Sequence, residues 1–302
     1  MLKRTLLFSN PYHLSTRNLQ LQITEKESGE IKTVPIEDIG YIIFEHPHIT
    51  FTQSVMQLLA ENNTAVIFCD QKFHPSSMLF HLDTHYTQTE KFKFQVNATE
   101  PLKKQLWQQT IKHKITNQAE LLKRLKKNDE PLRYKANHVK SGDSTNQEAQ
   151  AARAYWSELF EPPFTRERFG DAPNPALNYG YAILRAATAR ALSGTGLLST
   201  LGIHHRNKYN SFCLADDIME PYRPFVDEMV YNMQKMGLNC LDLGKVEKSE
   251  LLSILTIDVQ INDMVSPLMV ALSKTCQSLA LCFEGELRKI NYPSFVYEYK
   301  ST

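Results

Sequence analysis

The stretch Leu19-Gln20-Leu21-Gln22-Ile23-Thr24 alternates apolar and polar side chains with a period of two. Successive side chains of a strand point to opposite faces, so the alternation predicts a strand with one buried face. Ser28-Gly29 then predicts a turn, and residues 31–34 predict the returning strand. This pattern is typical of an antiparallel sheet that packs one face on a core.

Further strands are predicted on both sides of this hairpin. Residues 5–8 and 41–44 are short apolar runs, and residues 64–69 form a longer one that ends at Asp70. Residues 54–60 change to helical spacing and stop at Asn62-Asn63. We therefore expect residues 1–82 to form a small β domain with one short helix.

The rest of the chain has a different pattern. Residues 83–100 are polar without a strong period and predict a linker. Helical spacing then dominates residues 101–302, in segments 102–125, 146–156, 175–192, 225–236, 247–258 and 263–290. The predicted fold class is α+β, with a small N-terminal β domain followed by a larger all-helical C-terminal domain.

Composition limits the class of protein. The chain has 302 residues, of which 42% are hydrophobic and 22% charged, as in a globular protein with a well-buried core. Its five cysteines form no CxxC pair, and their odd number excludes a complete disulfide framework and favours a reducing compartment. No signal peptide or membrane span is predicted, so we expect a cytoplasmic protein.

The net charge of +1 hides an asymmetry along the chain. Residues 91–140 hold thirteen Lys/Arg against four Asp/Glu, whereas residues 211–260 hold four against nine. A basic segment can neutralise phosphates and an acidic one can hold cations, which suits a metal-dependent enzyme that acts on nucleic acid. The alternative is a solvated basic helix face with no partner.

Residues 202–224 concentrate groups that carry chemistry. Imidazole and carboxylate groups are the ligand types of a divalent metal site. This stretch supplies five of them, from His204, His205, Asp216, Asp217 and Glu220. Arg206, Lys208 and Arg223 lie among them and suit phosphate binding. The alternative is that the histidines lie at helix ends and the acids only complement a helix dipole.

Four motifs occur in an order that indicates a family: Ile36–Gly40, Thr64–Asp70, Asn178–Arg185 and Leu214–Pro224. Together they resemble the CRISPR-associated integrase of the spacer-acquisition module, most closely its type II branch, over roughly the whole chain. The resemblance implies an N-terminal β domain that forms a homodimer and a helical catalytic domain that carries a metal site.

The resemblance also implies the catalytic, metal-binding residues, which are Glu148, His205 and Glu220. Gly202 sets the register for His205, because the family spacing is Gly-x-x-His. Adjacent helical residues point about 100° apart, so we expect His204 and His205 not to face one pocket together. His204 and Asp217 are secondary candidates. For Glu148 the alternative is a capping box with Thr145.

The implied reaction is the joining of a DNA fragment's 3′-hydroxyl to a phosphodiester of the repeat array, with Mg²⁺ or Mn²⁺. Arg206, Lys208, Arg223 and Arg153 are predicted to hold phosphates. The implied partners are double-stranded DNA, a small companion adaptation protein and, in type II systems, the RNA-guided effector nuclease. Two alternatives are a stand-alone metal-dependent DNA nuclease and a non-catalytic DNA-binding scaffold.

Overall fold

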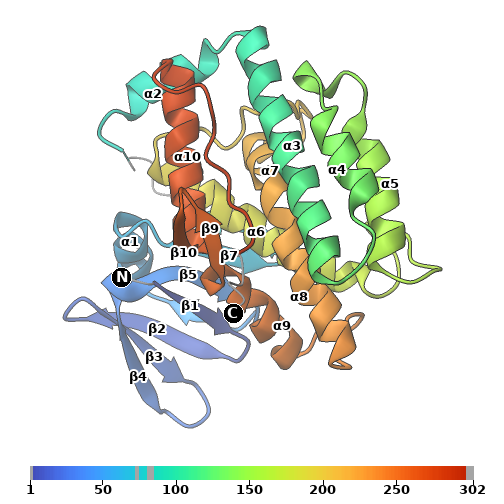
Figure 1. The fold of residues 1–302 in the computed structure, drawn as a ribbon. Coiled ribbons are helices and arrows are strands. Elements are labelled where there is room, and N and C mark those ends of the chain that lie inside the picture. Colours follow the sequence, from blue (N-terminus) through green and yellow to red (C-terminus); the bar gives the residue numbers. More distant parts are fainter. Residues whose placement is uncertain (1–2, 72–74, 80–84, 297–302) are drawn as a thin grey trace. The chain divides into compact units, whose positions relative to one another are not determined.

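The computed structural model describes residues 3–71, 75–79 and 85–296. The chain divides after residue 84 into two compact units, residues 1–84 and 85–302. Each unit is described by itself. Figure 1 shows strands concentrated in the first and helices in the second.

Within the described residues of the first unit, two four-stranded sheets and one short α-helix share a core. One sheet has the order β1 (Arg4–Phe8), β5 (Ile39–Phe44), β7 (Ala65–Cys69), β8 (Pro75–Leu79). The other has the order β4 (Ile31–Pro35), β3 (Gln20–Glu25), β2 (Tyr12–Arg17), β6 (Thr50–Phe51). Helix α1 (Gln53–Glu61) adds Val55 and Leu59 to the apolar cluster that both sheets share.

The antiparallel expectation holds only for part of this unit. Strands β2, β3 and β4 pair antiparallel as the alternation predicted, but β1, β5 and β7 run parallel. All six residues of β5 are buried, and the strand pairs with β1 on one side and β7 on the other. A continuous apolar run of this kind indicates a central parallel strand.

The second unit is mostly helical. Its helices are α2 (Gln88–Val96), α3 (Glu100–Arg124), α4 (Glu130–Asn137), α5 (Gln147–Leu159), α6 (Asn174–Gly194), α7 (Cys213–Met219), α8 (Arg223–Lys235), α9 (Lys245–Leu252) and α10 (Leu268–Glu284). Helix α6 contacts α7, α8, α9 and α10, and most of its side chains are buried. Its alanines and Gly180 allow this close packing, since a Cβ at Gly180 would lie 2.5 Å from Val226.

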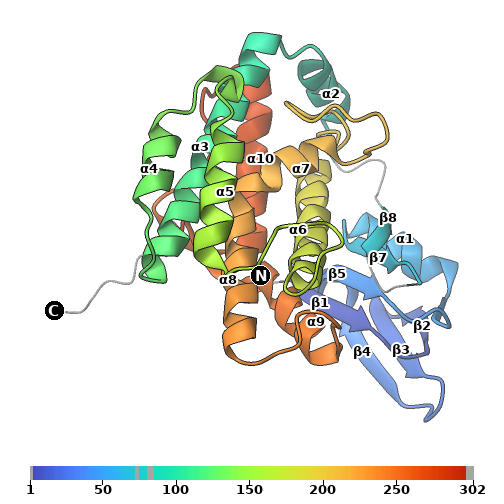
Figure 2. The ribbon, with the colours of Figure 1, turned by 90° about the vertical axis from the view of Figure 1, so that its right-hand side faces the viewer.

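Helix α3 carries residues of the candidate site on its inner face. It packs beside α4 and α5 (Figures 1 and 2). It also contacts the short 3₁₀ segment Glu220–Tyr222 that follows α7. Lys114, Asn117 and Gln118 on α3 point inward with Trp107 and Ile111. Helices α3, α5 and α7 therefore converge on one region of the unit.

Two elements differ from the sequence-based expectation. Residues 88–96 of the predicted linker form α2, in which Gln95 is buried and bonds the backbone of Leu198 in both directions. Residues 258–267, predicted as the junction of two helices, form the hairpin β9 (Asp258–Ile261) and β10 (Met264–Pro267). Asn262 and Asp263 both have positive φ, as a two-residue hairpin turn requires.

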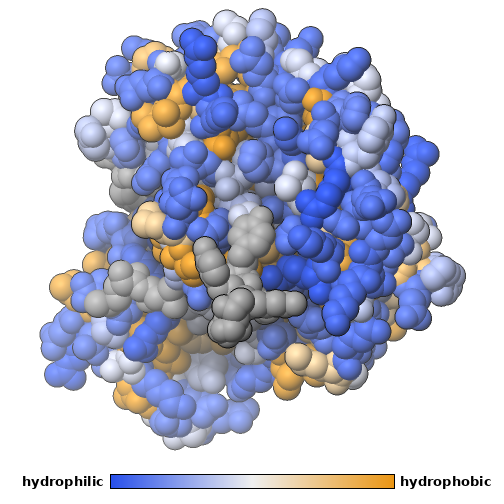
Figure 3. Space-filling model, in the orientation of Figure 1, coloured by the Kyte–Doolittle hydropathy of each residue, from blue (hydrophilic) through white to orange (hydrophobic). Residues whose placement is uncertain are grey.

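The surface is consistent with the composition. The face in Figure 3 is mostly hydrophilic, and its apolar side chains form small separate groups. No helix among the described residues is long and apolar enough to cross a membrane. All five cysteines are free thiols.

Candidate active site

The loop between α6 and α7 is organised by one buried carboxylate, Asp217 on α7. Its oxygens accept the backbone N–H groups of Ile203, His204 and His205 at 2.7, 2.9 and 3.2 Å. The backbone approaches so closely that a Cβ on Gly202 would lie 2.7 Å from Asp217 and 2.5 Å from the His205 carbonyl. Only glycine fits here, which explains the Gly-x-x-His spacing in physical terms.

Asp217 also orients the ring of His205. Nδ1 of His205 lies 2.5 Å from Oδ1 of Asp217 and must carry the proton, because the carboxylate can only accept. This hydrogen bond raises the pKa of His205. The other ring nitrogen, Nε2, remains available for a ligand, as in the carboxylate–histidine pairs that support metal sites. Asp217 is thus placed to position His205.

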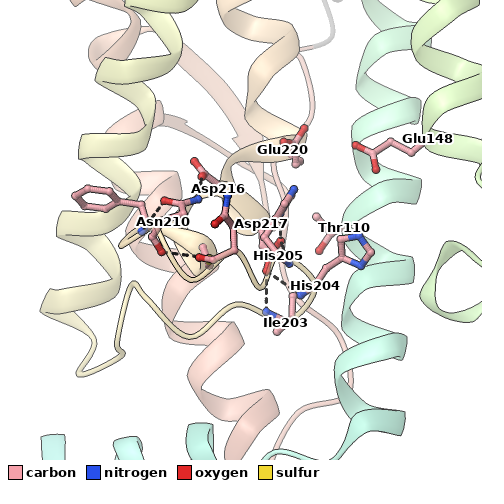
Figure 4. Close-up of polar contacts among 12 residues, drawn as sticks. Thr110, Glu148, Ile203, His204, His205, Asn210, Asp216, Asp217 and Glu220 are labelled. Carbon is pink, nitrogen blue, oxygen red and sulfur yellow. Dashed lines mark hydrogen bonds and ion pairs between the residues drawn. The ribbon is translucent and has the colours of Figure 1, made fainter. Parts of the chain in front are cut away.

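The helical argument about His204 and His205 does not apply, because residues 203–206 form a loop. The His204 ring stacks on Trp107 with 4.1 Å between centroids, and the His205 ring meets Trp107 edge-on at 5.8 Å. Burial lowers the pKa of His204. Both rings therefore share one buried indole as their support (Figure 4 labels both).

Glu148 lies in the first turn of α5, and its side chain is not part of a capping box. Asp143 caps this helix instead: its carboxylate accepts the N–H groups of Gln147 and Glu148 at 2.8 and 3.0 Å. Asn146 at the cap position has a left-handed backbone and makes no side-chain cap. The carboxylate of Glu148 therefore takes no part in the cap and points towards the side where Glu220 and His205 lie (Figure 4).

Glu220 begins the 3₁₀ turn after α7, and only 6% of its side chain is exposed. Oε2 lies 2.7 Å from the Lys114 ammonium and Oε1 lies 2.9 Å from Nε of Arg223. Burial raises the pKa of Glu220, but Arg223 and Lys114 together outweigh it, so the pKa is lowered and the group is charged. Oε2 nevertheless has no partner in hydrogen-bond geometry.

Lys114 on α3 joins the two glutamates. Its ammonium lies 2.6 Å from Oε1 of Glu148 and 2.7 Å from Oε2 of Glu220, and 12% of its side chain is exposed. Burial lowers the pKa of Lys114, but the carboxylates of Glu220 and Glu148 more than compensate and raise it. The position between two of the three predicted ligands therefore already attracts and holds a cation.

The side-chain types of the predicted ligands, Glu148, His205 and Glu220, suit a divalent ion, although the three side chains do not converge on one point. No three His, Cys, Asp or Glu side chains within residues 3–71, 75–79 and 85–296 converge closely enough to hold one. The donors available are an imidazole nitrogen and two carboxylates that share a cation, and one of these carboxylate oxygens, Oε2 of Glu220, is buried without a hydrogen bond. Oxygen-rich donors with one imidazole suit Mg²⁺ or Mn²⁺.

The predicted phosphate-binding residues fall into two groups. Arg206 and Lys208 are exposed in the loop; Arg206 pairs with Glu100 at 2.6 Å and Lys208 lies over the Tyr209 ring. Arg153 is exposed on α5. Arg223 instead points inward, paired with Glu220 and held 4.5 Å from the centroid of Tyr181.

A cavity of about 570 Å³ opens beside His205. Its lining includes the basic side chains of Lys103, Arg206 and Lys208, together with Glu100 and Cys213. Cys213 donates to the backbone oxygens of Asn207 and Asn210, and burial raises the pKa of its thiol. The cavity thus presents positive charge next to the imidazole without a reactive thiolate.

The family model for CRISPR-associated protein Cas1 matches residues 6–239. The chain belongs to the Cas1 family. The CRISPR-associated endonuclease Cas1 of Neisseria meningitidis serogroup C (strain 8013) is 39% identical over 278 residues, which cover 91% of this chain and 90% of the relative. A second Cas1 endonuclease, from Pyrobaculum aerophilum, is 25% identical over 86% of this chain and 92% of its own. The family resemblance predicted from the four motifs is confirmed.

Solved structures agree with the Cas1 fold. A casposase bound to integration product superposes with a TM-score of 0.80, 19% sequence identity and coverage of 100% of this chain and 96% of its own. A Cas1 protein from Thermotoga maritima gives a TM-score of 0.74 with 17% identity, over 98% of this chain and 100% of its own. The predicted fold class, β strands followed by a mostly helical region, is confirmed.

The sequence did not single out Lys114 and Trp107 as site residues of this Cas1 family member. Trp107, Ile111 and Lys114 are four and three residues apart, so they share one side of α3. A lysine on the same side as a buried tryptophan is a usable signal, because a lysine that is buried almost always has a charged partner. The assignment of Glu148, His205 and Glu220 as metal ligands stays a prediction.

Proposed function

We propose that the chain is a metal-dependent DNA integrase of CRISPR adaptation. It would join the 3′-hydroxyl ends of short DNA fragments, the new spacers, to the repeat array, and it would also have DNA endonuclease activity. The observation that carries the proposal is that Glu148 and Glu220 share one cation beside a histidine whose ring is oriented by Asp217. Membership of the Cas1 family, whose Neisseria meningitidis and Pyrobaculum aerophilum members are named endonucleases, supports it.

Glu148, Glu220 and Nε2 of His205 would hold Mg²⁺ or Mn²⁺. Such an ion would supply Lewis-acid stabilisation of the charge that develops at the phosphorus during phosphoryl transfer. Asp217 would keep Nδ1 of His205 protonated and Nε2 free. Trp107 packs against the rings of His204 and His205, so these rings would be held in place before the substrate binds.

The cavity beside His205 would receive the DNA backbone. Lys103, Arg206 and Lys208 supply three positive charges along its lining, and each can pair with a phosphate. Arg206 would exchange its exposed pair with Glu100 for such a phosphate, because an exposed ion pair contributes little stability. Arg153 would extend this basic surface. Arg223, which points inward, would neutralise the negative charge of Glu220.

The nucleophile would belong to the DNA. A 3′-oxygen of the fragment forms a bond to the phosphorus of the array while the bond from that phosphorus to the array's own 3′-oxygen breaks. The attacking hydroxyl gives its proton to water, and the leaving 3′-oxygen takes one from water. No protein nucleophile is needed in this scheme. Cys213, the thiol that lines the cavity, has a raised pKa and two backbone hydrogen bonds, so it is poorly suited to attack.

The partners would be double-stranded DNA, a second copy of the chain bound through the N-terminal β domain, and a small companion protein. A solved Cas6-RT-Cas1–Cas2 complex, whose chain superposes with a TM-score of 0.72 and 20% identity, supports a companion of the Cas2 kind. The type II motifs suggest that the RNA-guided effector nuclease helps to select fragments. This work would take place in the cytoplasm.

The test is a strand-transfer assay with supercoiled DNA that carries a repeat, a labelled short duplex and the companion protein, with Mn²⁺ or with chelator. Integrase function predicts joined product that requires the ion. Cutting without joining would favour a stand-alone nuclease, in which water replaces the 3′-hydroxyl at the same site. Neither product would favour a DNA-binding scaffold.

A further inference from the structure

Lys114 occupies a position that no other described side chain shares. Its ammonium contacts one oxygen of Glu148 and one of Glu220, at 2.6 and 2.7 Å, and these carboxylates come from α5 and from the turn after α7. Lys114 itself comes from α3, and only 12% of its side chain is exposed. Three separate elements thus meet at one cation.

The two glutamates and the two basic groups in direct contact with them balance in charge. The carboxylates of Glu148 and Glu220 carry two negative charges, and Lys114 and Arg223 carry two positive charges. A divalent cation added to this group would leave it with two excess positive charges in a region where water screens poorly. Within this contact group, the charge of Lys114 therefore opposes binding of a metal while Lys114 stays in place.

The contact distances lead to the same conclusion. Mg²⁺ binds carboxylate oxygens at about 2.0–2.1 Å, and the Lys114 nitrogen lies within 2.7 Å of both candidate oxygens. A dication bound to the same two oxygens would lie close to the ammonium and would be repelled by it. Of the two basic groups, Lys114 is the one that can leave. Arg223 is stacked on Tyr181, whereas a lysine has a flexible four-carbon stem.

We propose that Lys114 is the resident counter-cation of the Glu148–Glu220 pair and that a divalent cation binds there only by displacing it. This inference rests on the metal site of the proposed function. Lys114 holds the two carboxylates together without a metal, and it sets the concentration of free metal at which the site fills. It is a positioning residue that acts through Glu148 and Glu220.

The experiment is a Mn²⁺ titration of the full chain, with free Mn²⁺ followed by electron paramagnetic resonance. Three proteins are compared: wild type, Lys114→Met and the matched control Lys112→Met, which removes an exposed lysine of the same helix. We expect Lys114→Met to bind Mn²⁺ about tenfold more tightly or better, because the competing charge is gone. Lys112→Met should bind like the wild type.

Equal or weaker binding by Lys114→Met would overturn the inference, since a lysine that only supports the ligands would weaken binding when removed. If neither wild type nor Lys114→Met bound Mn²⁺, the metal site of the proposed function would fall, and this inference with it. Should Lys114→Met not fold, a crystal structure of the wild type with Mn²⁺ decides. Displacement of the Lys114 nitrogen from both carboxylates supports the inference, and retention of both contacts with Mn²⁺ bound overturns it.

Discussion

At the scale of single residues, Asp217 and Asp216 are neighbours with different partners. Asp217 holds the loop backbone and the His205 ring, whereas Asp216 holds Arg185 at 2.6 and 3.1 Å and Asn210 at 2.7 Å. We predict that Asp217→Asn lowers both Mn²⁺ affinity and the rate of strand transfer by about ten- to a hundredfold, as loss of a group that orients a metal-binding histidine does.

Asp216→Asn is the matched control, because it removes the same charge from the adjacent position without touching His205. We expect it to keep most of the Mn²⁺ affinity. Mn²⁺ titration and strand transfer of the two variants, at equal folded fraction, give the comparison. An Asp217→Asn protein with unchanged Mn²⁺ affinity would show that His205 does not depend on this carboxylate.

A second residue-scale prediction concerns Asp227 on α8. Its carboxylate is buried and accepts hydrogen bonds from the hydroxyls of Tyr155 and Tyr181. Burial raises its pKa from the ordinary value of 3.8 to about 6 against the opposing effect of these bonds. A folded-state pKa above the unfolded one means that this group favours folding at low pH, and that this contribution is lost between about pH 4 and pH 6.

The contribution amounts to about 3 kcal/mol for a shift of this size. We predict that Asp227→Asn, which cannot ionise, becomes more stable relative to the wild type by about that amount as the pH rises from 4 to 7. Urea unfolding of both proteins at the two pH values measures the difference and cancels the other titrating groups. A difference that stays constant with pH would contradict the raised pKa.

At the scale of elements, the start of α5 decides where Glu148 points. The Thr145-x-x-Glu148 spacing fits a capping box, the alternative considered for Glu148, yet Asp143 makes the cap from outside that pattern. We predict that Asp143→Ala lowers the free energy of unfolding by about 1 kcal/mol, while Thr145→Ala changes it little. Urea unfolding of both variants gives the test. A larger loss of stability in Thr145→Ala than in Asp143→Ala would show that Thr145 caps the helix after all.

Sequence periodicity predicted the elements where one face is buried and the other is exposed. The alternation in residues 19–24 predicted β3, and the helical spacing of residues 102–125 predicted α3 closely. The hairpin of β9 and β10 was missed because Asn262-Asp263 lacks the glycine that marks most two-residue turns. Helix α2 was missed because only Gln95 of its nine residues is buried, so it has almost no apolar stripe.

At the scale of the whole molecule, the sequence predicted a β domain followed by a helical domain. It also predicted the family, which the similarity to known Cas1 proteins confirmed. Counting charges along the chain could not predict which groups form the site. Lys114 and Glu220 are separated by 106 positions in the sequence and come into contact only in the folded protein. The same applies to Trp107 beneath His204. Long-range contacts of this kind leave no local signal, so they had to come from the structure.

The central claim is that His205, held by Asp217, belongs to the site that joins DNA. The most direct measurement is the yield of joined product from wild type, His205→Ala and the control His138→Ala, an exposed histidine at the end of α4. All three are assayed with the companion protein and Mn²⁺ at equal folded fraction. The account predicts that joining disappears with His205→Ala and persists with His138→Ala. Joining at the wild-type level by a folded His205→Ala protein would contradict it.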